Sequence, residues 1–206
     1  MSSQRKFTCP GTAGELEGVL HLPEGRPRAI AVVAHPLPTM GGTMDNKVIT
    51  TLAKTFAELG CVALRFNFRG VGNSAGEFDS GNGEIEDVLS IVRHAQQEHG
   101  DLPLILSGFS FGGYVQARVA QHLHPHPHRL VLIAPAVGRF EMPPVRHDTL
   151  LVHGELDEVV PLADVLEWAR PLHLPIMVLP DAGHYFHGRL NQLRQIVLHA
   201  FNGNPP

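Results

Sequence analysis

An apolar run passes directly into a glycine-rich turn in the stretch Leu102-Pro103-Leu104-Ile105-Leu106-Ser107-Gly108-Phe109-Ser110-Phe111-Gly112-Gly113. Residues 102–106 predict a short buried strand, and the residues after Gly113 predict a helix. Between them lies Ser110 in the pattern Gly-x-Ser-x-Gly. A serine on such a turn has a strained backbone and an exposed hydroxyl, and the flanking glycines remove side chains where the turn is tightest. The stretch therefore predicts an α/β fold with a functional serine where a strand ends.

The rest of the chain alternates apolar runs with segments of helical period, which is typical of a mostly parallel sheet with helices on both faces. At the amino end, residues 6–9 and 16–22 flank a turn-like segment and predict an antiparallel hairpin at the edge of the sheet. Further strands are expected at residues 29–34, 62–66, 104–106, 130–134, 150–152 and 176–179, and helices at residues 47–59, 85–94, 114–122, 163–169 and 190–201. We expect a three-layer α/β/α sandwich with about eight strands, formed by residues 1–206 as a single domain.

Composition describes an ordinary globular protein. The chain has 206 residues, of which 43% are hydrophobic, and a formal net charge of −4, so charge gives no reason to expect a nucleic acid or an anionic membrane as partner. No apolar run is long enough for a signal peptide or a membrane span, which predicts a cytoplasmic protein. Cys9 and Cys61 are expected to be free thiols, because a core of this size needs no disulfide.

A serine hydroxyl is a poor nucleophile at neutral pH, so Ser110 needs a base and an acid that orients the base. His184 directly follows the last predicted strand, where a loop can bring its imidazole over Ser110. Asp157 follows the strand at residues 150–152 and lies at the carboxyl edge, where open α/β sheets bind ligands. The order serine, aspartate, histidine is the one associated with this type of turn.

Two other aspartates compete with Asp157 as the acid. Asp181 lies three residues before His184, whereas Asp148 precedes its strand and is expected at the opposite edge of the sheet. We favour Asp157. His153, on the strand before Asp157, is expected to be a partly buried structural histidine.

Acyl transfer develops negative charge on an oxygen atom, which backbone N–H groups must meet. The residue after the nucleophile, Phe111, is expected to supply one of them. The second is expected from the loop after the strand at residues 29–34. Because Pro36 and Pro38 have no N–H, Leu37 is the natural donor there. His35 is expected to order this loop through a hydrogen bond.

The chain resembles the α/β-hydrolase superfamily, and within it a small lidless bacterial group related to dienelactone hydrolases. The resemblance covers nearly the whole chain and rests on residues 35–47, residues 65–74, the turn at Ser110, the loop Gly154 to Asp157, and Gly183-His184. Such relatives usually read His-Pro-His-Pro where this chain has His35-Pro36-Leu37-Pro38. The difference leaves the predicted triad intact, but it puts any substrate contact by the missing histidine in doubt.

Other features limit the chemistry. Only about a dozen residues, 137–148, join two successive strands, which is too short for a cap domain and predicts an open site unsuited to long lipid chains. A serine nucleophile disfavours a dehalogenase, an epoxide hydrolase and a strict dienelactone hydrolase. No nucleotide- or zinc-binding motif is present, so no cofactor or metal is expected. The histidine-rich run at residues 122–128 alternates with prolines and predicts a solvated connection.

The sequence therefore predicts a serine hydrolase that cleaves small-molecule esters. The same triad could cleave an amide, a peptide or a thioester, and a catalytically idle binding protein is the alternative from another class. Pocket residues could include His35, Phe109 and Tyr185, with Leu37, Phe68 and Phe111 as further apolar candidates, although core packing explains the aromatic residues equally well. Whether the protein is a monomer or a homodimer is left open.

Overall fold

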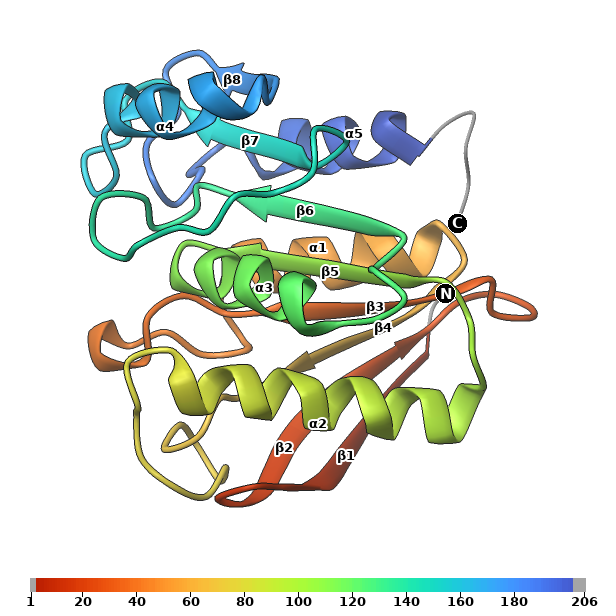
Figure 1. Cartoon of the computed structure of the whole chain (residues 1–206). Coiled ribbons are helices and arrows are strands. Elements are labelled where there is room, and N and C mark those ends of the chain that lie inside the picture. The colour runs from red at the N-terminus through yellow and green to blue at the C-terminus, as the bar shows by residue number, and fades with distance from the viewer. Residues whose placement is uncertain (1–2, 202–206) are drawn as a thin grey trace.

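A sheet of eight strands forms the middle layer of the molecule, with helices on both faces (Figure 1). The structure is a computed structural model that describes residues 3–201. In spatial order the strands are β1 (Ser3–Gly11), β2 (Gly14–Leu22), β4 (Cys61–Phe66), β3 (Ala29–Ala34), β5 (Leu104–Phe109), β6 (Arg129–Ile133), β7 (Leu150–Gly154) and β8 (Ile176–Leu179). β2 pairs antiparallel with β1 and β4, and all other neighbours in this order are parallel. The predicted α/β/α architecture and edge hairpin are confirmed.

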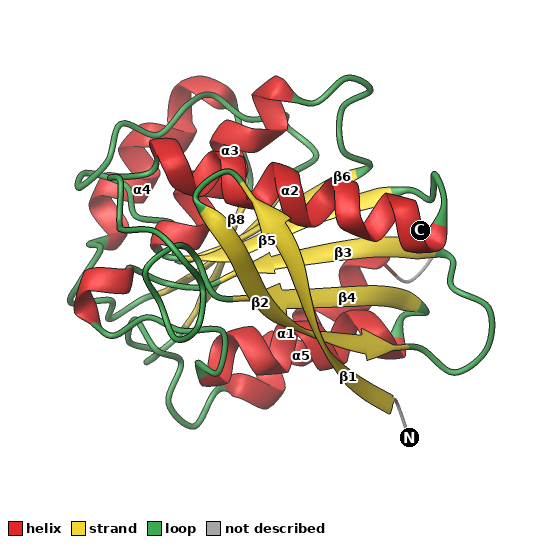
Figure 2. Ribbon diagram, turned by 90° about the horizontal axis from the view of Figure 1, so that it is seen from below, coloured by secondary structure: helices red, strands yellow, loops and turns green. Residues whose placement is uncertain are grey.

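The helices lie in two layers. Within residues 3–201 they are α1 (Lys47–Glu58), α2 (Asn82–His99), α3 (Phe111–His122), α4 (Leu162–Ala169) and α5 (Leu190–Phe201), with two short 3-10 turns, η1 (Pro38–Met40) and η2 (Arg170–Leu172). Helices α1 and α5 pack on one face of the sheet, in a core that includes Phe56 and Phe201. Helices α2, α3 and α4 cover the other face, and Figure 2 shows α2 and α3 across the sheet from α1 and α5.

Helix α1 shows how local sequence fixes an element near the functional edge. It begins after Asn46, whose side-chain oxygen accepts a hydrogen bond of 2.8 Å from the N–H of Val48. Leu52 and Phe56 recur on one face and are fully buried. Gly60, with φ of +89°, then turns the chain into β4. The loop after β3 is therefore held between a buried strand and a capped, packed helix.

Several predicted boundaries differ from the structure, among them those of α2 and β5. Helix α2 was expected at residues 85–94 but runs from Asn82 to His99. The Glu84 carboxylate explains the earlier start, because it accepts hydrogen bonds from the N–H of Gly81 at 2.7 Å and of Asp79 at 2.9 Å. Strand β5 begins at Leu104 instead of Leu102 and continues to Phe109, so it leads directly into Ser110.

Strands β3 to β8 run parallel to one another, so the loops that follow them meet at one edge of the sheet. The connection between β6 and β7, residues 134–149, contains no helix, so within residues 3–201 it forms no helical lid over this edge. Cys9 and Cys61 are both buried and free, as predicted. In the described part of the chain, no helix is long and apolar enough to cross a membrane.

Candidate active site

The turn between β5 and α3 holds Ser110 in an unusual backbone conformation, with φ of +55° and ψ of −118°. Two glycines make this turn possible. An added Cβ on Gly108 would lie 2.2 Å from the carbonyl oxygen of Gly112, and one on Gly112 would lie 2.2 Å from the carbonyl oxygen of Ala34. Both distances are far below van der Waals contact, so only glycine fits. The glycine pattern in the sequence thus has a direct steric cause.

Three side chains from different loops meet at this turn. The Nε2 atom of His184 lies 3.1 Å from the Oγ atom of Ser110, and its Nδ1 atom lies 2.7 Å from the Oδ2 atom of Asp157. All three side chains are buried or nearly so. The ring of Phe109 packs 4.9 Å from the imidazole of His184, measured between centroids, and limits its movement. Because a carboxylate only accepts hydrogen bonds, the Nδ1 atom of His184 is the protonated nitrogen and Nε2 faces the serine.

The carboxylate of Asp157 is held by the backbone as well as by His184. Its Oδ1 atom accepts hydrogen bonds from the N–H groups of Val159 at 2.9 Å and Val160 at 2.7 Å. Burial by itself raises the pKa of Asp157, but the hydrogen bonds from His184 and Val160 outweigh it and hold this pKa below its ordinary value. Asp157 therefore remains an anion beside His184 across the neutral pH range.

The competing aspartates do not contact His184. Asp181 is exposed, and its carboxylate lies 3.8 Å from the guanidinium of Arg189. Asp148 lies before β7, at the opposite edge of the sheet, where it pairs with Arg146. Of the three aspartates considered from the sequence, Asp157 is the one that the structure brings to the histidine.

His153 was expected to be partly buried, but it is completely buried. Its Nε2 atom lies 2.9 Å from the carbonyl oxygen of Val160 and 3.4 Å from the Oδ2 atom of Asp157. Because a carbonyl oxygen can only accept, Nε2 carries the proton. Burial lowers the pKa of His153, which keeps the ring neutral. His153 thus stabilises the loop that contains Asp157. The structural role expected from the sequence is confirmed, and the side chain is more deeply buried than expected.

Leu37 and Phe111, whose amides are predicted to meet the oxyanion, line the same hollow as Ser110. Leu37 lies just before η1, and Phe111 is the first residue of α3, whose amino end presents free N–H groups. Neither amide donates a hydrogen bond to another group within residues 3–201. Both N–H groups thus have no acceptor among the described residues.

His35 orders the loop that carries Leu37, as expected. Its Nδ1 atom lies 2.7 Å from the carbonyl oxygen of Pro36, and its Nε2 atom accepts a hydrogen bond of 3.1 Å from the N–H of Phe68. Burial lowers the pKa of His35 to about 4, so the ring is neutral in this arrangement. The side chain is fully buried beneath the loop and does not line the hollow. The prediction that His35 is a pocket residue was therefore wrong.

The hollow above Ser110 has a volume of about 70 Å³. It is lined by Pro36, Leu37, Met40, Gly41, Gly42, Asn46, Ser110, Phe111, Ala136, Arg139, Phe140, Val159, Val160, His184 and Tyr185. Tyr185 lines it as predicted, with 39% of its surface exposed. Phe109 and Phe68 are fully buried core residues and do not line the hollow, so core packing is the one of the two alternatives that the structure shows.

Met40 and Arg139, which also line this hollow, were missed by the sequence analysis. Met40 belongs to η1, and Arg139 lies in the connection after β6. Neither position has a motif that separates it from an ordinary surface residue. For Arg139, the short connection between β6 and β7 was the one feature of the sequence that could have indicated a place in the hollow. A connection without a cap domain has to pass close to the site.

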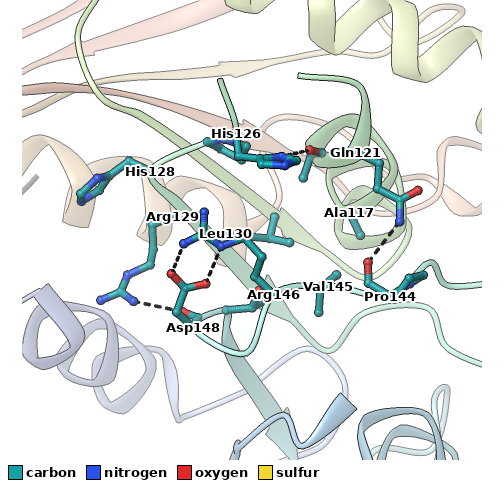
Figure 3. Close-up of a pocket in the computed structure, with 13 residues that line it drawn as sticks. Ala117, Gln121, His126, His128, Arg129, Leu130, Pro144, Val145, Arg146 and Asp148 are labelled. Atoms are coloured by element: carbon teal, nitrogen blue, oxygen red, sulfur yellow. Dashed lines mark hydrogen bonds and ion pairs between the residues drawn. The ribbon is translucent and has the colours of Figure 1, made fainter. Parts of the chain in front are cut away.

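A larger cavity of about 290 Å³ lies at the opposite, amino-terminal edge of the strands (Figure 3). It is bounded by the end of α3, the histidine-rich loop and the residues before β7, with His126, Gln121 and Arg146 around it. Arg146 there is paired with Asp148, and His126 lies 3.3 Å from the carbonyl oxygen of Ala120. No serine or cysteine lines this cavity. Among residues 3–201, no group of three or more His, Cys, Asp or Glu side chains is arranged to hold a metal ion.

Comparison with known proteins agrees with this architecture. The family model described as serine aminopeptidase, S33, matches residues 25–147. The structure is similar to that of a lidless α/β serine hydrolase from Xanthomonas campestris, with 37% identity and a TM-score of 0.92 over 99% of this chain and 96% of that one. An α/β serine hydrolase homologue from Coxiella burnetii is 38% identical, with a TM-score of 0.84 over 95% of this chain and 96% of that one.

A protein of Rickettsia prowazekii, described as uncharacterized, is 28% identical over 201 residues, which cover 91% of this chain and 84% of that protein. The family model spans more than half of the 206 residues, and the similar structures span nearly all of them. Together with the open edge above Ser110, these matches show that the chain belongs to the α/β serine hydrolases without a lid.

Proposed function

We propose that this protein hydrolyses small carboxylic esters through an acyl-enzyme on Ser110. The observation that supports the proposal most strongly is the chain of two hydrogen-bond distances, 3.1 Å from Ser110 to His184 and 2.7 Å from His184 to Asp157. Nucleophilic catalysis by serine needs a base within this reach and a third group that fixes the tautomer of the base. The family assignment supports the same class of chemistry.

In the first half of the reaction, the Oγ atom of Ser110 bonds to the ester carbonyl carbon while its proton moves to Nε2 of His184. Asp157 stabilises the resulting imidazolium through Nδ1. The carbonyl oxygen becomes negatively charged and accepts hydrogen bonds from the N–H groups of Leu37 and Phe111. When the tetrahedral intermediate collapses, the bond to the alcohol oxygen breaks and His184 gives its proton to the departing alcohol.

In the second half, water attacks the acyl carbon with His184 as general base. The bond between the acyl group and Ser110 breaks, the serine recovers its proton, and the carboxylic acid leaves. A general base contributes roughly 10²- to 10⁴-fold to such a reaction, and each oxyanion donor contributes roughly 10²- to 10³-fold.

The hollow supports small substrates. Its volume of about 70 Å³ accommodates a short acyl group, and exposed apolar side chains such as Met40 and Val159 surround it instead of a lid. A long acyl chain would remain largely in water, so chain length beyond a few carbons adds little binding energy.

An aminopeptidase is the second candidate, because the matching family model carries that description. A carboxylate close to the scissile bond is the partner whose charge complements a free amino terminus. No aspartate or glutamate lines the hollow, and Arg139 lines it with a positive charge that would repel an ammonium group. These features favour the ester over the amino-terminal peptide.

The test is hydrolysis of p-nitrophenyl esters, from acetate to long acyl chains, by the wild type and by Ser110→Ala. We expect turnover to peak at short chains and to fall by about 10⁴-fold or more in the mutant. Asp157→Asn and Asp181→Asn form a matched pair, since each removes one carboxylate that the sequence offered as the partner of His184. Only Asp157→Asn is expected to lose activity, by roughly 10³- to 10⁴-fold.

Activity that survives Ser110→Ala would contradict the mechanism. Labelling with a fluorophosphonate probe distinguishes an idle binding protein, because an unactivated Ser110 would remain unmodified. Equal loss in the two aspartate variants would contradict the assignment of the acid.

A further inference from the structure

Arg139 is presented to the hollow by a tight turn between β6 and β7. The N–H of Phe140 donates a hydrogen bond of 3.2 Å to the carbonyl oxygen of Ala136, and Gly138 between them has φ of +79°. The ring of Phe140 stacks on Tyr114 with centroids 4.8 Å apart and lies 5.2 Å from the ring of Phe111. The backbone that carries Arg139 is therefore anchored to helix α3, which begins directly after Ser110.

The guanidinium of Arg139 has a weak partner. Its Nη1 atom lies 3.2 Å from the Sδ atom of Met40, across the mouth of the hollow. A thioether sulfur is a poor hydrogen-bond acceptor. No carboxylate of residues 3–201 lies within ion-pair distance of Arg139, whereas Arg65, Arg69 and Arg146 each pair with one. A carboxylate entering the hollow would replace a weak contact with a strong one.

Acidic side chains near the site do not neutralise this charge. The carboxylate of Asp157 is buried behind His184 and is already hydrogen-bonded. Asp45, in the adjacent hollow, pairs with Arg65, and that hollow also includes Lys47. Asp164 lies beside Gly138 but forms no ion pair with Arg139 in the described part of the chain.

We propose that Arg139 binds a carboxylate carried by the substrate, so that the preferred ester has a negatively charged group close to the bond that is cleaved. This inference rests on the proposed esterase function and specifies its substrate class. The fork of N–H groups on a guanidinium matches the two oxygens of a carboxylate, which provides orientation as well as attraction. The carboxylate would displace the contact between Arg139 and Met40, and the loss of this weak hydrogen bond costs little binding free energy.

The experiment compares charged esters with neutral esters of similar size. For the alcohol side, 4-acetoxybenzoate is compared with methyl 4-acetoxybenzoate. For the acyl side, monomethyl glutarate is compared with methyl pentanoate. The proteins are the wild type, Arg139→Gln, Arg139→Lys and Arg26→Gln. The last is the matched control, because it removes the same charge from an exposed loop before β3, at the opposite edge of the sheet.

We expect the ratio of kcat/KM for the charged ester to that for its neutral partner to fall about tenfold in Arg139→Gln, in at least one of the two ester pairs. Arg139→Lys should lose only part of the preference, since it keeps the charge but not the fork. Arg26→Gln should retain the ratio of the wild type. The pair that responds identifies which side of the ester carries the carboxylate.

A ratio that changes no more in Arg139→Gln than in Arg26→Gln, for both pairs, would overturn the proposal. A binding measurement separates this failure from failure of the esterase function. NMR titration compares the Ser110→Ala variant with the double variant that also has Arg139→Gln. At least one of the two charged esters, 4-acetoxybenzoate and monomethyl glutarate, should bind the double variant more weakly. If the wild type hydrolyses none of the esters but this difference in binding is found, the hydrolysis proposal fails and the carboxylate site stands. If each charged ester binds the two variants equally well, the carboxylate site is rejected independently of catalysis.

Discussion

Leu37 already has a backbone conformation that proline can adopt. Its φ is −53° and its ψ is 119°, close to the values of an extended proline. The residue is nevertheless not proline, although Pro36 and Pro38 lie on both sides of it. The N–H that proline would remove is the one proposed to bind the oxyanion together with that of Phe111, and both residues line the hollow. A backbone donor at this position can therefore be deleted with little change in the chain path.

Leu37→Pro is accordingly expected to lower kcat toward a short ester by roughly 10²- to 10³-fold relative to Leu37→Ala, because it removes one oxyanion donor. Both variants lose the buried leucine side chain, but only the proline loses the N–H. Steady-state kinetics on both proteins measure the difference, and circular dichroism verifies that both are folded. Similar kcat values in the two variants would show that the Leu37 amide does not take part.

At the level of elements, a buried ion pair fixes the segment between β4 and α2 to helix α2. The guanidinium of Arg69 lies 2.8 Å from Asp87, measured from Nη2 to Oδ1, and the Arg69 N–H donates a hydrogen bond of 2.9 Å to Oδ2. Asp87 is fully buried on α2. The Arg69 guanidinium also donates a hydrogen bond of 3.0 Å to Thr12 in the β1–β2 hairpin. One arginine thus ties together a loop, a helix and the edge hairpin.

Asp87→Asn is expected to lower the free energy of unfolding by about 3–5 kcal/mol, because the charge of Arg69 is then left buried without a counter-ion. Asp148→Asn provides the comparison, since it breaks the largely exposed pair with Arg146 and should cost less than about 1 kcal/mol. Urea unfolding at pH 7 measures both. An equal loss in the free energy of unfolding in the two variants would show that burial does not determine how much the Arg69–Asp87 pair contributes to stability.

The sequence predicted the bounds of an element correctly where the hydrophobic periodicity and the residues at the ends of the element agree. Strands β3 and β8 and helix α5 have the predicted bounds, because an apolar run or an amphipathic stripe is a local property. Helix α2 was predicted too short at its start, where the capping bonds from Glu84 extend it beyond the apolar pattern.

At the scale of the whole molecule, buried neutral histidines make stability depend on pH. His35 and His21 are fully buried, and the pKa of each is lowered to about 4, mainly by burial and for His21 also by the neighbouring Arg65. In the unfolded chain both titrate near their ordinary value of about 6.5. Between these values the unfolded state binds more protons than the folded state, so stability falls as the pH drops from about 6.5 toward about 4.

We therefore expect the free energy of unfolding of the wild type to be lower at pH 5 than at pH 7. In His35→Gln this decrease should be smaller by roughly 2 kcal/mol, because His35 no longer binds a proton on unfolding in this pH range. His147→Gln, which changes an exposed histidine, should leave the decrease unaltered. Urea unfolding at the two pH values measures it, and an identical decrease in His35→Gln and the wild type would contradict the role of His35.

The sequence by itself determined the fold class, the order of the elements, and the tight turn at Ser110, because each depends on residues that are close together along the chain. It also limited the partners of Ser110 to a histidine and a few aspartates. Only the tertiary structure decided that Asp157 and not Asp181 lies against His184, that His35 and Phe109 are buried and do not line the hollow, and that Arg139 lines it. These outcomes depend on the direction in which a side chain leaves its loop, which is set by packing between segments that are distant in sequence.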